Sequence, residues 1–406
     1  MTKQRKIFGV SKTVFTLGIV SFLTDVSSEM LIPIIPQFLR FALGAPGVVV
    51  GLIEGVAEST ASLLRVYAGY LADRFGRPKL LAVLGYGLSA LSKPFLVFAS
   101  SWSHVLGVRF ADRFGKGIRS APRDVLIADA TDVDSRGRAF GLHRAMDSAG
   151  AALGPLVVIG LVVCCLGERF IVAPGCEHMG LYRSIFIAAM APAVLGWIVL
   201  SVFVREKAAE TNPAARPKLK LSAFDRKFKV FLAAVTVFAI GNSSDAFLVL
   251  RATSDPIGMS FVTFLMVYVA FNMVQSAVSL RSGILSDTLG RKPLMVVGWL
   301  VFAVCYFGIA RTTSASGIWL WFLIYGAHAG ITEGVIRAYA VDLAPEHLRG
   351  TAIGAYYTFT GVAVLPASLI AGFLWDAFGP AAPFYYGAAT SLAAVLILIV
   401  PLTKNR

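Results

Sequence analysis

The segment "GYLADRFGRPK", residues 69–79, returns as "GILSDTLGRKP", residues 283–293, at an offset of 214. Both copies keep a glycine, an aspartate and a Gly-Arg pair at the same spacing, and apolar runs lie on either side of each. Agreement at one offset in a chain of 406 residues indicates that the second half repeats the first.

Further pairs of positions support the repeat at nearly the same offset. They include Ser27, Ser28 and Glu29 with Ser243, Ser244 and Asp245; Glu58 and Ser62 with Asn272 and Ser276; and Asp129, Arg136, Gly137 and Gly141 with Asp342, Arg349, Gly350 and Gly354. Two similar halves are typical of secondary transporters, in which two helix bundles rock about a site near the membrane midplane.

The composition places this chain in a membrane. It is 57% hydrophobic and 15% charged, with a mean hydropathy of +0.73, so it lacks the polar surface that a soluble protein of this size needs. Apolar runs of about 20 residues span a bilayer. They predict an all-α protein of twelve transmembrane helices in two pseudo-symmetric six-helix bundles, at residues 14–39, 48–72, 79–99, 103–130, 139–165, 181–204, 228–250, 257–284, 293–311, 316–343, 350–376 and 381–402.

The distribution of basic residues predicts the orientation. Lys and Arg gather before the first helix, in every second loop and at the carboxyl end, which by the positive-inside rule places both termini in the cytoplasm. The polar segment 205–227, with two prolines and several bases, is predicted to be a cytoplasmic linker between a bundle over 1–204 and a bundle over 228–406. We therefore expect a multi-pass protein of the cytoplasmic (inner) membrane.

The net charge of +14 does not require a nucleic acid partner. The orientation bias and anionic lipids account for it. No phosphate-binding loop of the form GxxxxGK[ST] occurs, and no Ser, Cys or metal-ligand cluster has catalytic spacing. We expect no enzyme activity, no cofactor and no bound metal. Cys165 and Cys176 are interpreted as free thiols, with a disulfide as the alternative.

The repeated segment resembles the cytoplasmic loop signature of the major facilitator superfamily, and the twelve-helix layout extends this resemblance over the whole chain. Arg109 resembles the arginine of the family's fourth-helix motif. The resemblance implies that Asp73, Arg77 and Asp129 form a charge cluster that stabilises one conformation, with a weaker counterpart in the second half. The predicted gating residues are Gly69, Asp73, Arg74, Gly76, Arg77, Asp129, Asp287, Gly290, Arg291 and Asp342.

A second motif bears on the direction of transport. Gly141, Gly150, Gly154 and Pro155 follow the spacing Gx8Gx3GP, which resembles the fifth-helix motif of proton-coupled exporters. That motif normally closes with paired glycines, whereas Val158 and Ile159 occupy those places here. The resemblance implies antiport, the efflux of a small molecule in exchange for protons.

Residues 108–129, "VRFADRFGKGIRSAPRDVLIAD", hold eight charged residues. At 100° per residue most of them share one face of a helix, opposite an apolar face. Because a charge at the bilayer centre costs about 2.5–3.5 kcal/mol, this face must lie against protein or water. Arg119, Arg123 and Asp124 are interpreted as structural, since they approach the cytoplasmic surface.

Acidic residues, opposite in charge to the bases of 108–129, recur at helical spacing in the first two helices. Asp25 with Glu29 and Glu54 with Glu58 each lie four residues apart, on one face of a helix. Crowded acids and bases shift one another's protonation, as a proton-coupled carrier requires. The predicted substrate and proton pathway comprises Asp25, Glu29, Glu54, Glu58, Arg109, Asp112, Arg113, Lys116, Asp245, Glu333 and Arg337.

The sequence thus predicts a monomeric secondary active transporter with a small-molecule substrate and protons as the coupling ion. The basic face of 108–129 supports an alternative, proton-coupled uptake of an organic anion, and a metal complex is a third cargo. A receptor or scaffold that keeps the fold without transport is the alternative from another class.

Overall fold

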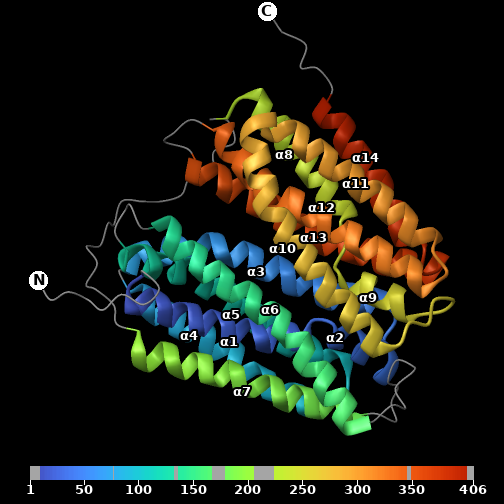
Figure 1. Cartoon of the computed structure of the whole chain (residues 1–406), viewed down its shortest axis with the longest axis horizontal. Coiled ribbons are helices and arrows are strands. Elements are labelled where there is room, and N and C mark those ends of the chain that lie inside the picture. The colour runs from blue at the N-terminus through green and yellow to red at the C-terminus, as the bar shows by residue number, and fades with distance from the viewer. Residues whose placement is uncertain are drawn as a thin grey trace, which may run out of the picture. The chain divides into compact units, whose positions relative to one another are not determined.

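In the computed structural model, every regular element that is described is a helix (Figure 1). The structure describes residues 10–75, 77–131, 136–166, 179–204, 224–344 and 349–399, and within these ranges the side chains of 66, 69–75, 128, 136–138, 141, 165, 166, 280, 283, 284, 287, 349 and 350 are not described. Most of the predicted linker, Cys176 and the side chain of Cys165 therefore lie outside the described residues.

The helices follow the predicted order. In the amino-terminal half they are α1 (Lys12–Leu31), α2 (Ile34–Gln37), the π-helical η1 (Phe38–Ala42), α3 (Gly47–Phe75), α4 (Pro78–Ser92), the 3₁₀-helical η2 (Lys93–Phe98), α5 (Trp102–Asp129), α6 (Arg136–Leu166) and α7 (Met179–Phe203). In the carboxyl-terminal half they are α8 (Arg226–Gly241), α9 (Ala246–Thr253), α10 (Phe261–Leu289), α11 (Arg291–Arg311), α12 (Ala315–Asp342), α13 (Arg349–Phe378) and α14 (Ala382–Ile399).

Ten stretches of the described chain are long and apolar enough to cross a membrane. The long helices α5 and α12 are not among the ten. In α5 the reason is the row of charged residues noted above. The protein is therefore a multi-pass, all-helical membrane protein, while twelve crossings and two cytoplasmic termini stay predictions.

Three segments predicted as single helices are not one regular α-helix: two are interrupted and one changes its helix type, so these predictions were wrong in detail. The predicted helix 14–39 has a turn at Ile32 and Pro33, and 79–99 continues from Lys93 as a 3₁₀ helix that contains Pro94. Proline supplies no N–H and clashes with the preceding turn. The predicted helix 228–250 stops at Gly241, and α9 starts only at Ala246.

The residues between α8 and α9 explain the third interruption. They read Asn242, Ser243, Ser244 and Asp245, whose short polar side chains compete for backbone hydrogen bonds. The Ser244 Oγ accepts a hydrogen bond of 3.2 Å from the Ala246 N–H. It thereby satisfies a backbone donor at the start of α9. Broken helices of this kind form binding sites in transporters.

The chain divides into two compact units. Among the described residues, the first unit holds 10–44, 56–166 and 179–204, and the second holds 45–55 and 224–399, with the gaps given above. In the first unit α1 packs against α6 and α7, and α4 packs against α5 and α7 (Figure 1). In the second, α10 packs against α12, α11 against α12 and α14, and α8 against α13 and α14.

Candidate functional site

Two glycines bring α5 close to two neighbouring helices. A Cβ atom on Gly115 would lie 2.5 Å from the carbonyl oxygen of Gly85 in α4, and one on Gly117 would lie 2.6 Å from the Leu64 Cβ in α3. Only a residue without a side chain permits such approaches. The charged face of α5 is thereby held against the helices that carry Ser89 and Glu58.

Arg113 is the centre of a charge network in the first unit. Its Nη1 lies 3.2 Å from Glu58 Oε1, and its Nε lies 3.8 Å from Asp112 Oδ2. The Arg113 side chain is 4% exposed, whereas the Glu58 side chain is 39% exposed. A buried guanidinium requires such partners, and the pair joins an interior cation to an acid whose side chain is partly exposed.

The other predicted residues of α5 belong to the same network. Ser89 donates a hydrogen bond to Asp112 Oδ1, and the buried Arg109 interacts electrostatically with both Asp112 and Glu58. Lys116 has Glu58 and Arg113 among its electrostatic neighbours. We call Glu58, Arg109, Asp112, Arg113 and Lys116 the first-unit charge network. Glu54, one turn before Glu58, is buried as well.

Lys93 is a site residue that the sequence prediction left out. It is only 1% exposed, and its Nζ donates to Ser27 Oγ at 2.5 Å and to Ser28 Oγ at 3.4 Å. Ser27 in turn donates to the carbonyl oxygen of Ala189 in α7 at 2.5 Å. The available signal was a lysine in an apolar helix together with the repeated serine pair, because a buried ammonium needs hydroxyl or carboxylate partners.

The glycines of the exporter-type motif pack against the helix turns that carry the first two acids. A Cβ on Gly150 would lie 2.5 Å from the Phe22 carbonyl oxygen and 3.2 Å from the Asp25 Cβ. One on Gly154 would lie 2.9 Å from the Glu29 Cβ. Small residues allow helices in a membrane to pack this closely. Pro155 follows inside α6, and the surroundings of Gly141 are not described.

Asp147 extends this contact toward α5. Ser21 donates a hydrogen bond to Asp147 Oδ1, and His143 Nδ1 lies 3.7 Å from Asp147 Oδ2. Asp25 interacts electrostatically with Asp147 and with Lys116. Asp25 is therefore linked to the first-unit charge network through Lys116, and His143 is a buried titratable residue that the sequence prediction did not name.

The residues interpreted as structural make local contacts. The Arg119 guanidinium lies 4.3 Å from the centre of the Tyr86 ring, which is a cation–π contact. Arg123 Nη2 lies 2.9 Å from Asp124 Oδ1. Both contacts lie within the first unit, in the part of α5 that is farther along the chain than Arg109.

In the second unit, the predicted polar residues fall into two separate groups. Tyr325 donates a hydrogen bond of 3.0 Å to Asp245 Oδ1. Glu333, Arg337 and Gln275 form the other group, since Arg337 Nη2 lies 3.6 Å from Glu333 Oε1 and Gln275 Nε2 donates to Glu333 Oε2 at 3.0 Å. Glu333 lies eight residues beyond Tyr325 on α12, a separation of about 12 Å at 1.5 Å per residue.

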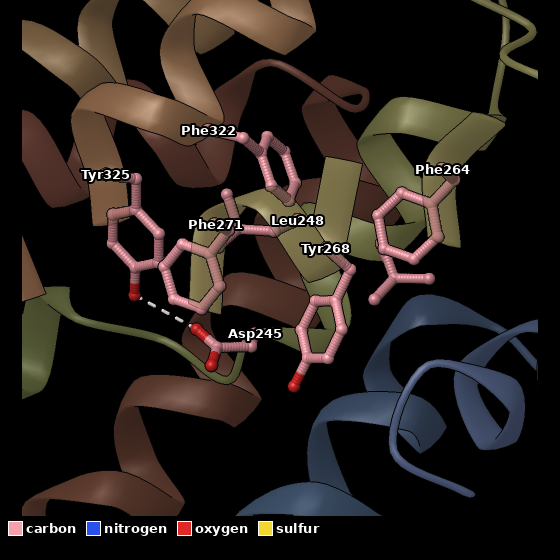
Figure 2. Close-up of a pocket in the computed structure, with 8 residues that line it drawn as sticks. Asp245, Leu248, Phe264, Tyr268, Phe271, Phe322 and Tyr325 are labelled. Carbon is pink, nitrogen blue, oxygen red and sulfur yellow. Dashed lines mark hydrogen bonds between the residues drawn. The ribbon is translucent and has the colours of Figure 1, made fainter. Parts of the chain in front are cut away.

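A small pocket, partly open to the surroundings, lies beside Asp245 at the α8–α9 break (Figure 2). Figure 2 shows the Asp245 carboxylate and the hydroxyls of Tyr268 and Tyr325 on one side of the pocket, with Phe271 between the two tyrosines. Sequence reasoning found Asp245 but missed the aromatic residues, which come from two helices, α10 and α12. The pocket is lined by Asp245, Leu248, Val249, Phe264, Tyr268, Phe271, Phe322 and Tyr325.

The predicted gating residues are described only in part. Arg291 Nε lies 2.5 Å from Asp342 Oδ2, so the structure joins two of the three charges expected in the second half. Gly290, just before α11, has a φ of 86°, a conformation that favours glycine. Arg77 and Asp129 are exposed. Gly76, the surroundings of Gly69 and the side chains of Asp73, Arg74 and Asp287 lie outside what the structure describes.

A family model of the Major Facilitator Superfamily matches residues 17–368 and again residues 230–406. The chain belongs to the Major Facilitator Superfamily. An uncharacterized MFS-type transporter of Methanocaldococcus jannaschii is 33% identical over 396 residues, covering 96% of this chain and 95% of the relative. The cis,cis-muconate transport protein of Acinetobacter baylyi is 23% identical, covering 89% of this chain and 87% of the relative.

A solved structure agrees with this assignment at the level of the fold. The crystal structure of a POT family transporter in complex with 5-aminolevulinic acid superimposes with a TM-score of 0.81, at 13% sequence identity, covering 98% of this chain and 97% of that one. At this identity the likeness concerns the fold alone. The protein is thus a membrane transporter of this superfamily, and its relatives imply small-molecule substrates.

Proposed function

We propose that this transporter exports a small solute from the cytoplasm in exchange for protons. It works by alternating access of an amino-terminal and a carboxyl-terminal six-helix bundle, as a monomer in the cytoplasmic membrane with both termini inside and without a cofactor. The observation that carries the proposal is the packing of Gly150 and Gly154 against the turns of Asp25 and Glu29. The motif that resembles exporters therefore positions the acids of α1.

The first-unit charge network supplies a path for the coupling proton. The Glu58 side chain is partly exposed, while its partner Arg113 is buried. A proton that binds to Glu58 removes the attraction between the two side chains and leaves Arg113 with Asp112. Lys116 interacts with both Glu58 and Asp25. A change of charge on either acid therefore alters the electrostatic interaction of Lys116 with the other.

The gating residues would couple this change to the conformation. The Arg291–Asp342 pair is half exposed, so it contributes at most about 1 kcal/mol. A contact this weak can break and form again in each transport cycle. We assign the same role to Asp73, Arg77 and Asp129 in the first half.

Proton-coupled uptake of an organic anion is the second candidate. Arg109, Arg113 and Lys116 give the first unit an interior rich in bases, and a cation cluster favours carboxylate ligands. The relative in Acinetobacter baylyi is named as a transporter of such an anion.

Proton flux in proteoliposomes tests the proposal. Purified protein is placed in liposomes that enclose a pH dye, a proton gradient is imposed, and pools of organic cations, organic anions and metal complexes are added. We expect one pool to trigger proton movement opposite to its own, and Asp25→Asn to abolish this flux. Asp255→Asn, which changes an exposed acid outside the helices, should transport as the wild type does.

The other outcomes contradict the proposal. Movement of protons and an anion in the same direction would establish uptake. Normal flux in both Asp25→Asn and Glu29→Gln would show that coupling does not use these acids. Folded protein without any flux would favour a receptor or scaffold.

A further inference from the structure

His143 is a buried titratable residue that the proposed transport cycle does not use. It lies on α6, about 10 Å along the axis from the first residue of the helix, Arg136. The residue is 4% exposed. Its Nδ1 lies 3.7 Å from Asp147 Oδ2, which is longer than a hydrogen bond. The enclosed imidazole thus faces an acid to which Nδ1 is not hydrogen-bonded.

The second ring nitrogen of His143 lacks a partner in this packing. Nε2 is buried and has no hydrogen-bond partner among the residues that the structure describes. Leaving a buried polar atom unpaired costs stability, so such atoms are rare in folded proteins. A protonated imidazole carries an N–H on both nitrogens, and here the N–H on Nε2 would lack an acceptor. This conformation therefore favours the neutral ring.

The acid beside His143 has other partners. Ser21 on α1 donates a hydrogen bond to Asp147 Oδ1, and Arg144 Nη1 lies 3.9 Å from Asp147 Oδ2. Asp25, also on α1, interacts electrostatically with Asp147. Part of the charge of Asp147 is thus balanced by Arg144 before it can attract a proton to the imidazole.

Helix α5 adds an ion pair to the surroundings of His143. Arg123 and Asp124 both act electrostatically on the imidazole, and Arg123 Nη2 lies 2.9 Å from Asp124 Oδ1. From α6 itself, Asp147 and Arg144 act on the ring as well. The bases and the acids have opposite effects, so burial decides the charge of the ring.

The contact between α1 and α6 is tight beside His143. A Cβ on Gly18 of α1 would lie 2.4 Å from Met146 Sδ of α6. Ala139, one turn before His143, is fully buried in the apolar core of the first unit. Closely packed contacts of this kind change between discrete arrangements and do not deform continuously. We therefore expect an added charge on His143 to change the arrangement of these helices.

We propose that His143 is a pH sensor of this transporter: a proton on its imidazole disfavours the packing of α6 against α1 seen here and favours a conformation in which Nε2 has an acceptor. Histidine suits this role because its charge can change between about pH 5 and pH 8. The predicted orientation places the start of α6 at the cytoplasmic side, so the sensor responds to cytoplasmic pH. The inference rests on the proposed function for the cycle that it regulates, whereas the coupling proton stays with Asp25 and Glu58.

Equilibrium unfolding in mixed micelles tests the charge of His143. A histidine in an unfolded chain has a pKa of about 6.5. A ring that stays neutral in the fold therefore lowers the folding equilibrium constant by up to about tenfold between about pH 7.5 and about pH 5.5. We expect His143→Leu to lose this part of the pH dependence and to be at least as stable as the wild type at the higher pH.

The matched control is a histidine that water reaches. His104 is exposed at the start of α5, so His104→Gln should keep the pH dependence of the wild type. Equal pH dependence of the wild type and His143→Leu would overturn the proposal.

Thiol labelling measures the conformational change itself. The four native cysteines are replaced by alanine, and Ala139→Cys supplies a thiol at a position that is buried in this conformation. Labelling by N-ethylmaleimide is compared with His143 intact and with His143→Leu at each pH, so that the direct effect of pH on the thiol cancels. We expect the ratio of the two rates to rise by about threefold to tenfold on acidification, as linkage to one proton allows.

A ratio of rates that does not change with pH would overturn the proposal. The unfolding measurement decides the question on its own if Ala139→Cys does not fold. In that case, a pH dependence that His143→Leu does not reduce is the result against the sensor.

Proton flux separates this inference from the proposed function. A protein whose labelling responds to pH through His143 but which moves no protons would keep the sensor and remove proton exchange. A protein that exchanges protons, and whose labelling is the same with His143 intact and with His143→Leu at both pH values, would remove the sensor alone.

Discussion

Glu58 Oε1 lies 3.2 Å from Arg113 Nη1, so a partly exposed acid is paired with a buried base. The partners come from α3 and α5, which meet at Gly117. The contact is the part of the first-unit charge network that includes a partly exposed acid.

A double-mutant cycle should measure this contact. We expect Glu58→Gln and Arg113→Gln each to lower the free energy of unfolding in detergent, with a coupling energy of about 1 kcal/mol. That value is near the lower end for bonds to charged groups, because Glu58 is partly exposed. Effects that add within about 0.3 kcal/mol would show that the pair does not interact in solution.

The close contact between α6 and α1 predicts opposite results for two glycines of one helix. Gly150→Ala should destabilise the protein by about 1–3 kcal/mol, since its Cβ would overlap a backbone oxygen. Gly160→Ala meets no atom within 4 Å, so it should stabilise α6 by up to about 1 kcal/mol. Thermal unfolding in detergent measures both, and shifts of the same sign would contradict the packing.

The buried Lys93 should tolerate an apolar residue of its own length better than a larger cation. Lys93→Met keeps the shape and should fold, but Asp112 and Asp25 lose an electrostatic partner, so proton exchange should fall at least tenfold. Lys93→Arg adds bulk at a position that is 1% exposed and should cost about 1–3 kcal/mol. Melting curves and liposome flux test both variants, and full transport by Lys93→Met would remove Lys93 from the coupling site.

The Arg291–Asp342 pair predicts a kinetic effect without a large loss of stability. Arg291→Gln should change the free energy of unfolding by less than about 1 kcal/mol, because the pair is half exposed. It should change the maximal transport rate more than the apparent affinity for solute. The adjacent, exposed Lys292→Gln serves as the control. Identical kinetics in the two variants would exclude a gating role.

The membrane setting and the family were predictable from local patterns. Long apolar runs indicate membrane-spanning helices, because the surface of such a helix must suit the hydrocarbon around it. The loop segment at Gly69 and its copy at Gly283 carry the family signature. The acids and bases of α1, α3 and α5 were also predictable, because a charge inside an apolar segment has few structural explanations.

The partners of those charges required the tertiary structure. Arg113 contacts Glu58, and Gly150 contacts the helix turn of Asp25. Both contacts depend on how helices that are far apart in sequence cross. Periodicity places a residue on a face of its own helix but does not specify the helix opposite. The prediction of a continuous helix over 228–250 failed for a related reason: local polar side chains at 242–245 outweighed the apolar runs on both sides.

The sequence by itself determined a repeated, all-helical membrane transporter and the positions of its interior charges, because hydrophobicity and charge act through composition and spacing. Only the tertiary structure decided which charges pair, that Lys93 is enclosed by hydroxyls, and that rings from α10 and α12 surround Asp245. Those features arise from side-chain contacts between distant segments, and short-range packing forces act only where the fold has already brought the segments together.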